Sequence, residues 1–108
     1  MKTSSSKAKG HLLEALVRDK LIERFGLSRE QIRIPIGSEK GSDIKLTKSA
    51  QLAVPLKIEC KSRKSFSLYS YWDQANAHEG DLEPVVIIKA NRRRPLICLD
   101  LDYFLGLL

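Results

Sequence analysis

The sequence predicts a single α/β domain in which helices flank a central mixed β-sheet. Apolar side chains recur at helical spacing near both ends of the chain, whereas residues 56–61 alternate between apolar and charged side chains as a strand does. Two further apolar runs bracket a basic turn at residues 91–95, which is typical of a hairpin. Because 108 residues are enough for one domain and too few for two, we expect one compact core.

The first half of the chain is expected to contain one helix and several short strands. Residues 1–9 are polar and basic, and we expect them to form a flexible arm that precedes a single folded domain at residues 10–108. The helical pattern starts at about Gly10 and runs to Phe25, where Gly26 provides a C-terminal cap. Strands are then expected at residues 32–36, 43–46 and 56–61, separated by a glycine-rich turn at 37–42 and a loop around 48–51.

The second half is expected to contain a helix, a hairpin and a last helix. Residues 69–78 have helical character, and Gly80 ends the segment. Residues 85–89 and 96–99 form the two hairpin strands, and Asp100 caps a final helix whose leucines and phenylalanine recur at i, i+3, i+4 and i+7. The expected order of elements is therefore α-β-β-β-α-β-β-α.

The net charge of +6 is carried by two short segments. Lys2, Lys7 and Lys9 supply half of it and Arg92–Arg94 supply the other half, so that the other 13 of the 19 basic side chains balance the 13 acidic ones. An otherwise balanced globule with two positive segments favours a polyanionic partner such as nucleic acid. The residues expected to contact DNA are Lys7, Lys9, Lys57, Arg63, Lys64, Arg92, Arg93 and Arg94.

Composition argues against several other classes of protein. No apolar run approaches the ~20 residues that span a bilayer, so we expect no membrane association and a soluble protein in the cytoplasm. Cys60 and Cys98 lie in apolar runs without metal-binding spacing and are predicted to be reduced and buried. His11 and His78 are too few and too far apart in sequence for a histidine metal site or a triad, and we interpret them as surface residues.

Three carboxylates occupy positions where a carboxylate is unusual. Glu14 shares the core-facing stripe of the first helix, Asp43 opens a strand after a glycine-serine turn, and Glu59 lies in mid-strand. Taken one at a time, they are read as a rim residue, a turn residue and half of a surface charge ladder. Strand alternation places Glu59 and Lys61 on the same face of their strand.

Together these residues resemble the bipartite signature of the PD-(D/E)XK nuclease superfamily. Gly41-Ser42-Asp43-Ile44 is followed by Glu59-Cys60-Lys61, and Glu14 stands on the preceding helix where that superfamily places a further carboxylate. The chain is most similar to the archaeal-type Holliday junction resolvases and their phage relatives, which share the helix start Lys9–Glu14 and the Gly37-Ser38 turn. The resemblance covers nearly the whole chain and implies a restriction-endonuclease-like core.

The resemblance also implies a metal site and roles for its residues. Glu14, Asp43 and Glu59 would hold Mg²⁺, for which Mn²⁺ can substitute, and the backbone carbonyl of Cys60 would add another oxygen. Lys61 would orient the attacking water and stabilise the transition state. Without metal, converging carboxylates repel one another, which predicts raised carboxyl pKa values.

The implied activity is hydrolysis of phosphodiester bonds in DNA, with paired nicks in four-way junctions. Two symmetric cuts imply a homodimer, for which the apolar last helix is one candidate interface. Ser38 is a candidate phosphate contact, and Gln74 is a candidate accessory residue near the site. Two alternatives remain open: another structure-selective or restriction/repair-type nuclease on the same fold, or a non-catalytic nucleic-acid-binding module.

Overall fold

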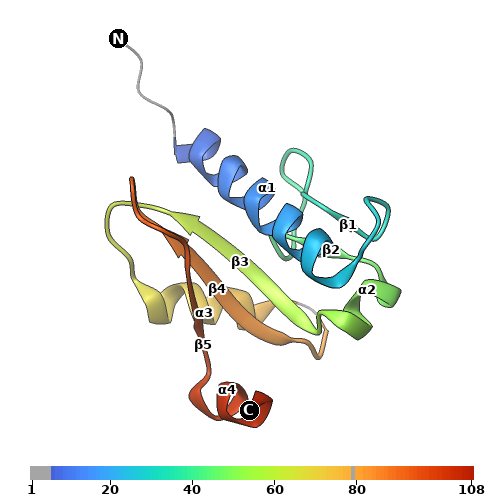
Figure 1. The fold of residues 1–108 in the computed structure, drawn as a ribbon. Coiled ribbons are helices and arrows are strands. Elements are labelled where there is room, and N and C mark those ends of the chain that lie inside the picture. Colours follow the sequence, from blue (N-terminus) through green and yellow to red (C-terminus); the bar gives the residue numbers. More distant parts are fainter. Residues whose placement is uncertain (1–5, 79) are drawn as a thin grey trace.

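A computed structural model describes residues 6–78 and 80–108 of the chain (Figure 1). Within these residues the centre is a three-stranded sheet in which β3 and β4 are parallel and β5 is antiparallel to β4. The strands are β3 (Leu56–Ser62), β4 (Glu83–Lys89) and β5 (Leu96–Leu99). This arrangement confirms the predicted α/β class with a central mixed sheet, and it is compatible with a restriction-endonuclease-like fold.

Helices cover both faces of this sheet. α1 (Ser6–Phe25) packs on β3, and α3 (Leu68–Ala77) packs on β3 and β4 from the opposite side (Figure 1). α2 (Lys48–Ala53) leads into β3, and α4 (Leu101–Leu107) follows β5. Within the described residues, no helix is both long and apolar enough to cross a membrane.

β3 is buried on both faces, and its alternating sequence gives each face a different chemistry. Ile58 and Cys60 join Leu13 and Val17 of α1 in the hydrophobic core. The alternate positions turn three charged side chains toward α3, namely Lys57, Glu59 and Lys61. A strand covered on both sides has little water to solvate these charges, so each needs a partner within the protein.

Several local signals give the boundaries that the sequence predicts. Gly26 ends α1 with φ +65°, and the Leu27 N–H donates to the Ile22 carbonyl at 3.2 Å, as in a glycine C-cap. The Asp100 side chain accepts from the Tyr103 N–H at 2.9 Å and starts α4. The expected hairpin strand at residues 96–99 is β5 itself.

The helices differ from the prediction at two places. α1 begins at Ser6, so Lys7 and Lys9 are helical and do not belong to a flexible arm; residues 1–5 of the expected arm lie outside the described residues. The expected loop around residues 48–51 belongs to α2, whose Thr47 cap accepts from the Ala50 N–H while Ala50 is fully buried. A buried alanine with a threonine cap three residues earlier stabilises one short helix.

The strands before the central sheet are shorter than expected. β1 (Ile32–Arg33) and β2 (Lys45–Leu46) form a separate antiparallel pair. The expected strand at residues 32–36 stops before Pro35, because proline has no N–H for a ladder. Asp43 lies ahead of β2 and does not open that strand, which leaves its backbone free to bond elsewhere.

Candidate functional site

The candidate site is built on the free edge of β3. β3 is an outer strand of the central sheet, so the backbone groups of Ile58 and Cys60 that point away from β4 need a partner other than a sheet neighbour. Asp43 provides it: its N–H donates to the Ile58 carbonyl at 2.9 Å, and its Oδ2 accepts from the Cys60 N–H at 2.7 Å. Asp43 is therefore fixed against the strand that carries Glu59.

Glu59 is held from both sides. Its residue is only 7% exposed. Lys61 Nζ lies 3.4 Å from Oε2, which confirms that the two side chains share a face, and His78 Nε2 lies 3.0 Å from Oε1. The Lys61 ammonium also lies 5.1 Å from the centre of the Tyr71 ring on α3. The carboxylate thus has a nitrogen partner on each oxygen.

Glu14 approaches from α1. It is half-buried, and its Oε1 lies 3.3 Å from Nδ1 of His11, one helical turn earlier. Leu13 and Val17 on the same helix are buried in the core, so the packing of α1 on β3 sets where Glu14 can reach. The helix therefore delivers a third carboxylate toward the strand edge.

Burial and the charges of neighbouring carboxylates raise the pKa values of Asp43 and Glu14. Burial is the main cause of the raised pKa of Asp43; the hydrogen bond from Cys60 lowers this pKa, and the charge of Glu59 raises it again. Burial also raises the pKa of Glu14, followed by the charge of Asp43, while His11 opposes the shift and Glu59 adds to it. The direction of the shift agrees with the prediction for Asp43 and Glu14, but burial contributes more to it than the repulsion between carboxylates from which it was predicted.

Cys60 lies at the centre of this group. Burial raises the pKa of its thiol, and the charges of Asp43, Glu14 and Glu59 raise it further, so the thiol stays neutral and is no nucleophile. It is a free thiol, as is the half-buried Cys98. An extended residue directs its N–H and C=O to the same edge, so the Cys60 carbonyl faces the edge that Asp43 occupies.

A strand edge that carries an aspartate, a glutamate and a lysine, with a glutamate from the first helix, matches the arrangement that the superfamily resemblance implies. The model of the family described as "Phage putative PDDEXK endonuclease" matches residues 5–106. The chain belongs to this family. Comparison with curated proteins gave no match, and comparison with solved structures gave none. Membership of the PD-(D/E)XK superfamily is confirmed, whereas the closer similarity to Holliday junction resolvases stays a prediction.

PDDEXK nucleases generally use divalent metal ions, and the donor atoms of this chain suit one. Carboxylates and a backbone carbonyl are the hard oxygen ligands that Mg²⁺ prefers. In the part of the chain that the structure describes, no three His, Cys, Asp or Glu side chains are arranged closely enough to hold a metal ion. Glu14 is turned to His11, so closing a ligand set requires Glu14 to reorient. Each oxygen of Glu59 has two acceptor sites and can therefore bind an ion while it keeps its contact with Lys61 or His78.

Two residues predicted for the PDDEXK site, Ser38 and Gln74, are exposed. Ser38 is exposed in a turn closed by an ion pair in which Arg33 donates to both oxygens of Glu39, at 2.9 and 2.7 Å. This pairing lowers the pKa of Glu39 to about 2. Gln74 is exposed on α3. The roles of Ser38 as a phosphate contact and of Gln74 as an accessory residue stay predictions.

Lys57 requires a correction. The prediction made it a DNA contact, but its side chain is buried at 5% exposure, and its ammonium donates to the carbonyls of Asn76, His78 and Gly80 at 3.0, 2.8 and 3.2 Å. An ammonium has three N–H groups, and all three are used here. Lys57 is therefore a structural residue that fixes the end of α3.

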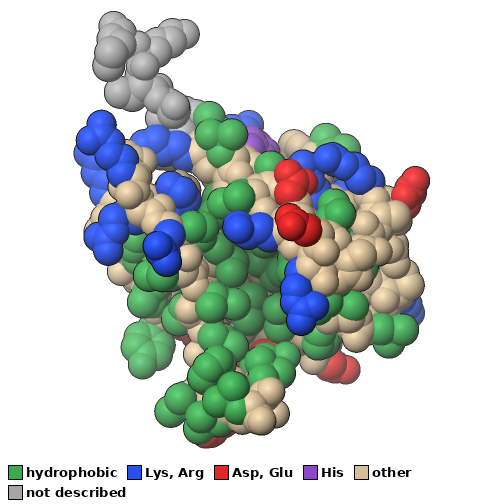
Figure 2. Space-filling view, in the orientation of Figure 1, with side chains coloured by type: hydrophobic (Ala, Val, Ile, Leu, Met, Phe, Trp, Pro, Cys, Tyr) green, Lys and Arg blue, Asp and Glu red, His purple; other side chains and the backbone are tan. Residues whose placement is uncertain are grey.

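The other residues predicted to contact DNA gather at one end of the molecule, which we call the basic pole. Lys9 of α1, Arg63 and Lys64 after β3, and Asn91 in the β4–β5 turn line one hollow of about 190 Å³. Arg93 and Arg94 line a second hollow on the same turn, and Arg92 is exposed there with φ +61°. Figure 2 shows Lys and Arg side chains gathered at this end of the molecule. Lys7 is exposed in the first turns of α1. Folding thus brings Lys9 of the first positive segment beside the turn that carries the second, while Lys2 lies outside the described residues.

Both histidines were missed as site residues. The spacing of His11 and Glu14 on one helix was a usable signal, because residues three apart are neighbours on a helix. No comparable signal exists for His78, which lies directly after α3 and reaches Glu59 only through the packing of α3 on β3. The interpretation of His78 as a surface residue is therefore wrong.

The raised pKa of Asp43 leads to a testable effect on stability. The Asp43 carboxyl has a higher pKa in the folded than in the unfolded state. The folded protein therefore loses stability as the pH rises from the ordinary pKa of aspartate to the raised value. Asp43→Asn keeps an acceptor for the Cys60 N–H but cannot ionise. In the metal-free protein, we expect this variant to raise the Tm at neutral pH by roughly 4 °C, with the gain disappearing in acid.

Thermal unfolding in EDTA at several pH values measures this difference. Asp81→Asn is the matched control, because Asp81 is exposed. A lower Tm for Asp43→Asn at neutral pH would contradict the prediction.

Proposed function

We propose that this PDDEXK endonuclease is a metal-dependent enzyme that resolves four-way DNA junctions by paired nicks. Membership of the family indicates a nuclease that acts on DNA. The observation that supports metal dependence is the convergence of three carboxylates on the Cys60 backbone. Asp43 binds its N–H at 2.7 Å, Glu59 is the preceding residue of β3, and Glu14, whose pKa is raised by burial, is close enough for the charges of both to raise this pKa further. A cluster of this kind raises the free energy of the metal-free protein and is relieved by a cation.

The proposed roles follow from the position of each group. Asp43, Glu59 and Glu14 hold Mg²⁺, or Mn²⁺ in its place, with the Cys60 carbonyl as a further oxygen ligand. The bound ion supplies positive charge against the charge that grows on the phosphate oxygens and makes water a better nucleophile at neutral pH. Lys61, held beside Glu59, orients the attacking water and offsets negative charge in the transition state.

The basic pole supports the proposed contact with DNA. It lies at the C-terminal end of β3, the strand on which Glu59 and Lys61 are found, so a duplex arm on the pole is continuous with the candidate site. Arginine side chains match pairs of phosphate oxygens, and the turn presents three of them. We propose that the pole binds one arm of a junction, in the cytoplasm of the host cell.

Paired nicks require two sites in fixed relation, and the apolar face of α4 and β5 supports a homodimer. Figure 2 shows hydrophobic side chains gathered where Figure 1 places α4. A groove of about 510 Å³, lined in part by Trp72 and Leu101, opens between α3 and this face. A stable dimer buries roughly 800 Å² of each partner. The exposed large apolar residues here are Leu96, Ile97, Leu101, Phe104, Leu105, Leu107 and Leu108.

The nuclease proposal is tested by cleavage of a labelled four-way junction with and without Mg²⁺. We expect Asp43→Asn and Glu59→Gln to reduce Mg²⁺-dependent nicking at least about 100-fold while DNA binding in EDTA is retained, because each change removes negative charge from the site. Glu23→Gln, an exposed change on α1, is the control.

Two results would contradict parts of this proposal separately. Wild-type protein that does not cut in Mg²⁺, or cutting that survives both substitutions, would show that the site is wrong. Equal cutting of a linear duplex with the same sequence would contradict the resolvase assignment and leave a general nuclease.

The basic pole gives a second prediction, measured as the salt dependence of junction binding in EDTA. The double variant Arg93→Ala/Arg94→Ala should bind the junction more weakly. The negative slope of log K against log salt should become less steep, by about 0.9 for each phosphate that the protein no longer neutralises. Lys20→Ala/Lys48→Ala removes the same charge from exposed positions away from the pole and should have a smaller effect. An unchanged slope in the arginine variant would remove the turn from the binding surface.

The dimer gives a third prediction. Leu101→Asp/Leu105→Asp places two charges on the apolar face, and sedimentation should then give the mass of a monomer where the wild type gives twice that mass. Leu52→Asp is the control, because Leu52 is 88% exposed on α2. A wild-type protein that is monomeric at tens of micromolar would contradict the interface.

A further inference from the structure

We propose that His78 is a positioning residue for Glu59, and that the buried ammonium of Lys57 holds His78 in place. The inference rests on the proposed function, because it takes Glu59 as a ligand of the catalytic metal. It assigns a purpose to two groups that the motif does not include, a fully engaged buried lysine and a histidine after the end of α3.

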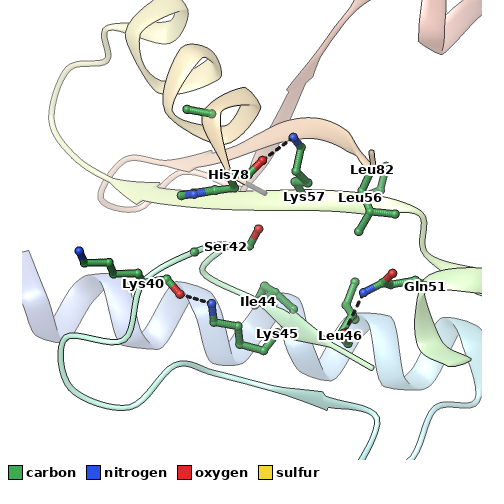
Figure 3. Close-up of a pocket in the computed structure, with 12 residues that line it drawn as sticks. Lys40, Ser42, Ile44, Lys45, Leu46, Gln51, Leu56, Lys57, His78 and Leu82 are labelled. Atoms are coloured by element: carbon green, nitrogen blue, oxygen red, sulfur yellow. Dashed lines mark hydrogen bonds between the residues drawn. The ribbon is translucent and has the colours of Figure 1, made fainter. Parts of the chain in front are cut away.

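Lys57 fixes the backbone from which His78 projects. The last carbonyls of a helix have no partner within the helix and carry its negative dipole end, so an ammonium is a suitable partner for them. Lys57 Nζ donates to the carbonyls of Asn76, His78 and Gly80, and its bond to His78 is the shortest of the three at 2.8 Å (Figure 3). The chain at His78 is therefore tied directly to β3.

The ring of His78 contacts Glu59, which follows Lys57 on the same face of β3. Lys57 and Glu59 are two residues apart on β3, about 7 Å along the strand. The backbone of His78 is bound at the first position, and its Nε2 lies 3.0 Å from Glu59 Oε1 at the second. One residue is thus attached to β3 at both its carbonyl and its ring.

This attachment limits how the Glu59 carboxylate can turn. Lys61 lies at 3.4 Å from the other oxygen, so rotation of the carboxylate breaks an interaction on each side. Donors of this kind orient metal-binding carboxylates, and their removal typically weakens metal binding 10–100-fold. His78 also lines a cavity of about 480 Å³ together with Ser42 and Ile44, the neighbours of Asp43, so the ring stands in the wall next to the candidate site (Figure 3).

The test measures Mn²⁺ binding by titration calorimetry and junction cleavage in three variants. His78→Ala should weaken Mn²⁺ binding about 10-fold or more and lower kcat without raising KM for DNA. His78→Gln should restore most of the binding, because its amide keeps an N–H donor but does not replace imidazole as a metal ligand. Asn76→Ala is the control, since it changes an exposed side chain and leaves the carbonyl that Lys57 binds.

Lys57→Met tests the second half of the inference. Lys57→Met should weaken Mn²⁺ binding as His78→Ala does. The double variant Lys57→Met/His78→Ala should bind Mn²⁺ no more weakly than either single variant, because both changes remove the same support of Glu59. Where Lys57→Met does not fold by circular dichroism, the comparison of His78→Ala with His78→Gln carries the test.

The outcomes separate this inference from the function on which it rests. Mn²⁺ binding and cleavage by His78→Ala at wild-type levels would overturn the inference and leave the nuclease intact. Equal weakening in His78→Ala and His78→Gln would also overturn it, since a donor alone would then not suffice. Wild-type protein that neither binds Mn²⁺ nor cuts DNA would instead overturn the proposed function.

Discussion

The contact between Asp43 and the free edge of β3 is the constraint on which the candidate site depends. An outer strand has main-chain groups that no neighbouring strand pairs, and where the strand is buried these groups need other partners. Asp43 pairs two of them: its N–H donates to the Ile58 carbonyl, and its carboxylate accepts from the Cys60 N–H. The same contact places the Asp43 carboxylate beside Glu59, at the strand edge to which the Cys60 carbonyl points. The two hydrogen bonds of Asp43 therefore both complete the edge of β3 and place Asp43 beside Glu59 in the cluster of carboxylates.

The protein balances this cluster with its own positive and polar groups. His11 approaches Glu14, while Lys61 and His78 approach the two oxygens of Glu59. Asp43 instead receives a main-chain N–H, and burial raises the pKa of both Asp43 and Glu14. The metal-free arrangement is thus one in which the carboxylates are partly neutralised by internal partners. A divalent cation would compete with His11 for Glu14, and it would add to the partners that orient Glu59.

Three surfaces of different chemistry surround the central sheet. The basic pole includes the start of α1, the end of β3 and the β4–β5 turn. The acidic cluster, made of Glu14, Asp43 and Glu59, lies along the edge of β3. Apolar side chains are exposed on α4. The net charge of +6 understates the contrast between them, because the acidic cluster and the basic residues partly cancel in the sum. Since Glu59 and Lys61 precede Arg63 on one strand, the acidic and basic regions are held in fixed relation by β3 itself.

Sequence alone determined the parts of this protein whose signals are local. The alternation of residues 56–61 fixed the faces of β3, Asp100 and Gly26 marked helix ends, and the spacing of Asp43 and Glu59 with Lys61 identified the superfamily. Packing decided the rest. Lys57 became a buried tie to α3 and not a DNA contact, and His78 became a partner of Glu59, because their partners are main-chain and side-chain atoms some 20 residues away in sequence. Which carbonyls lie above a strand depends on where a helix ends against it, and only the tertiary structure contains that information.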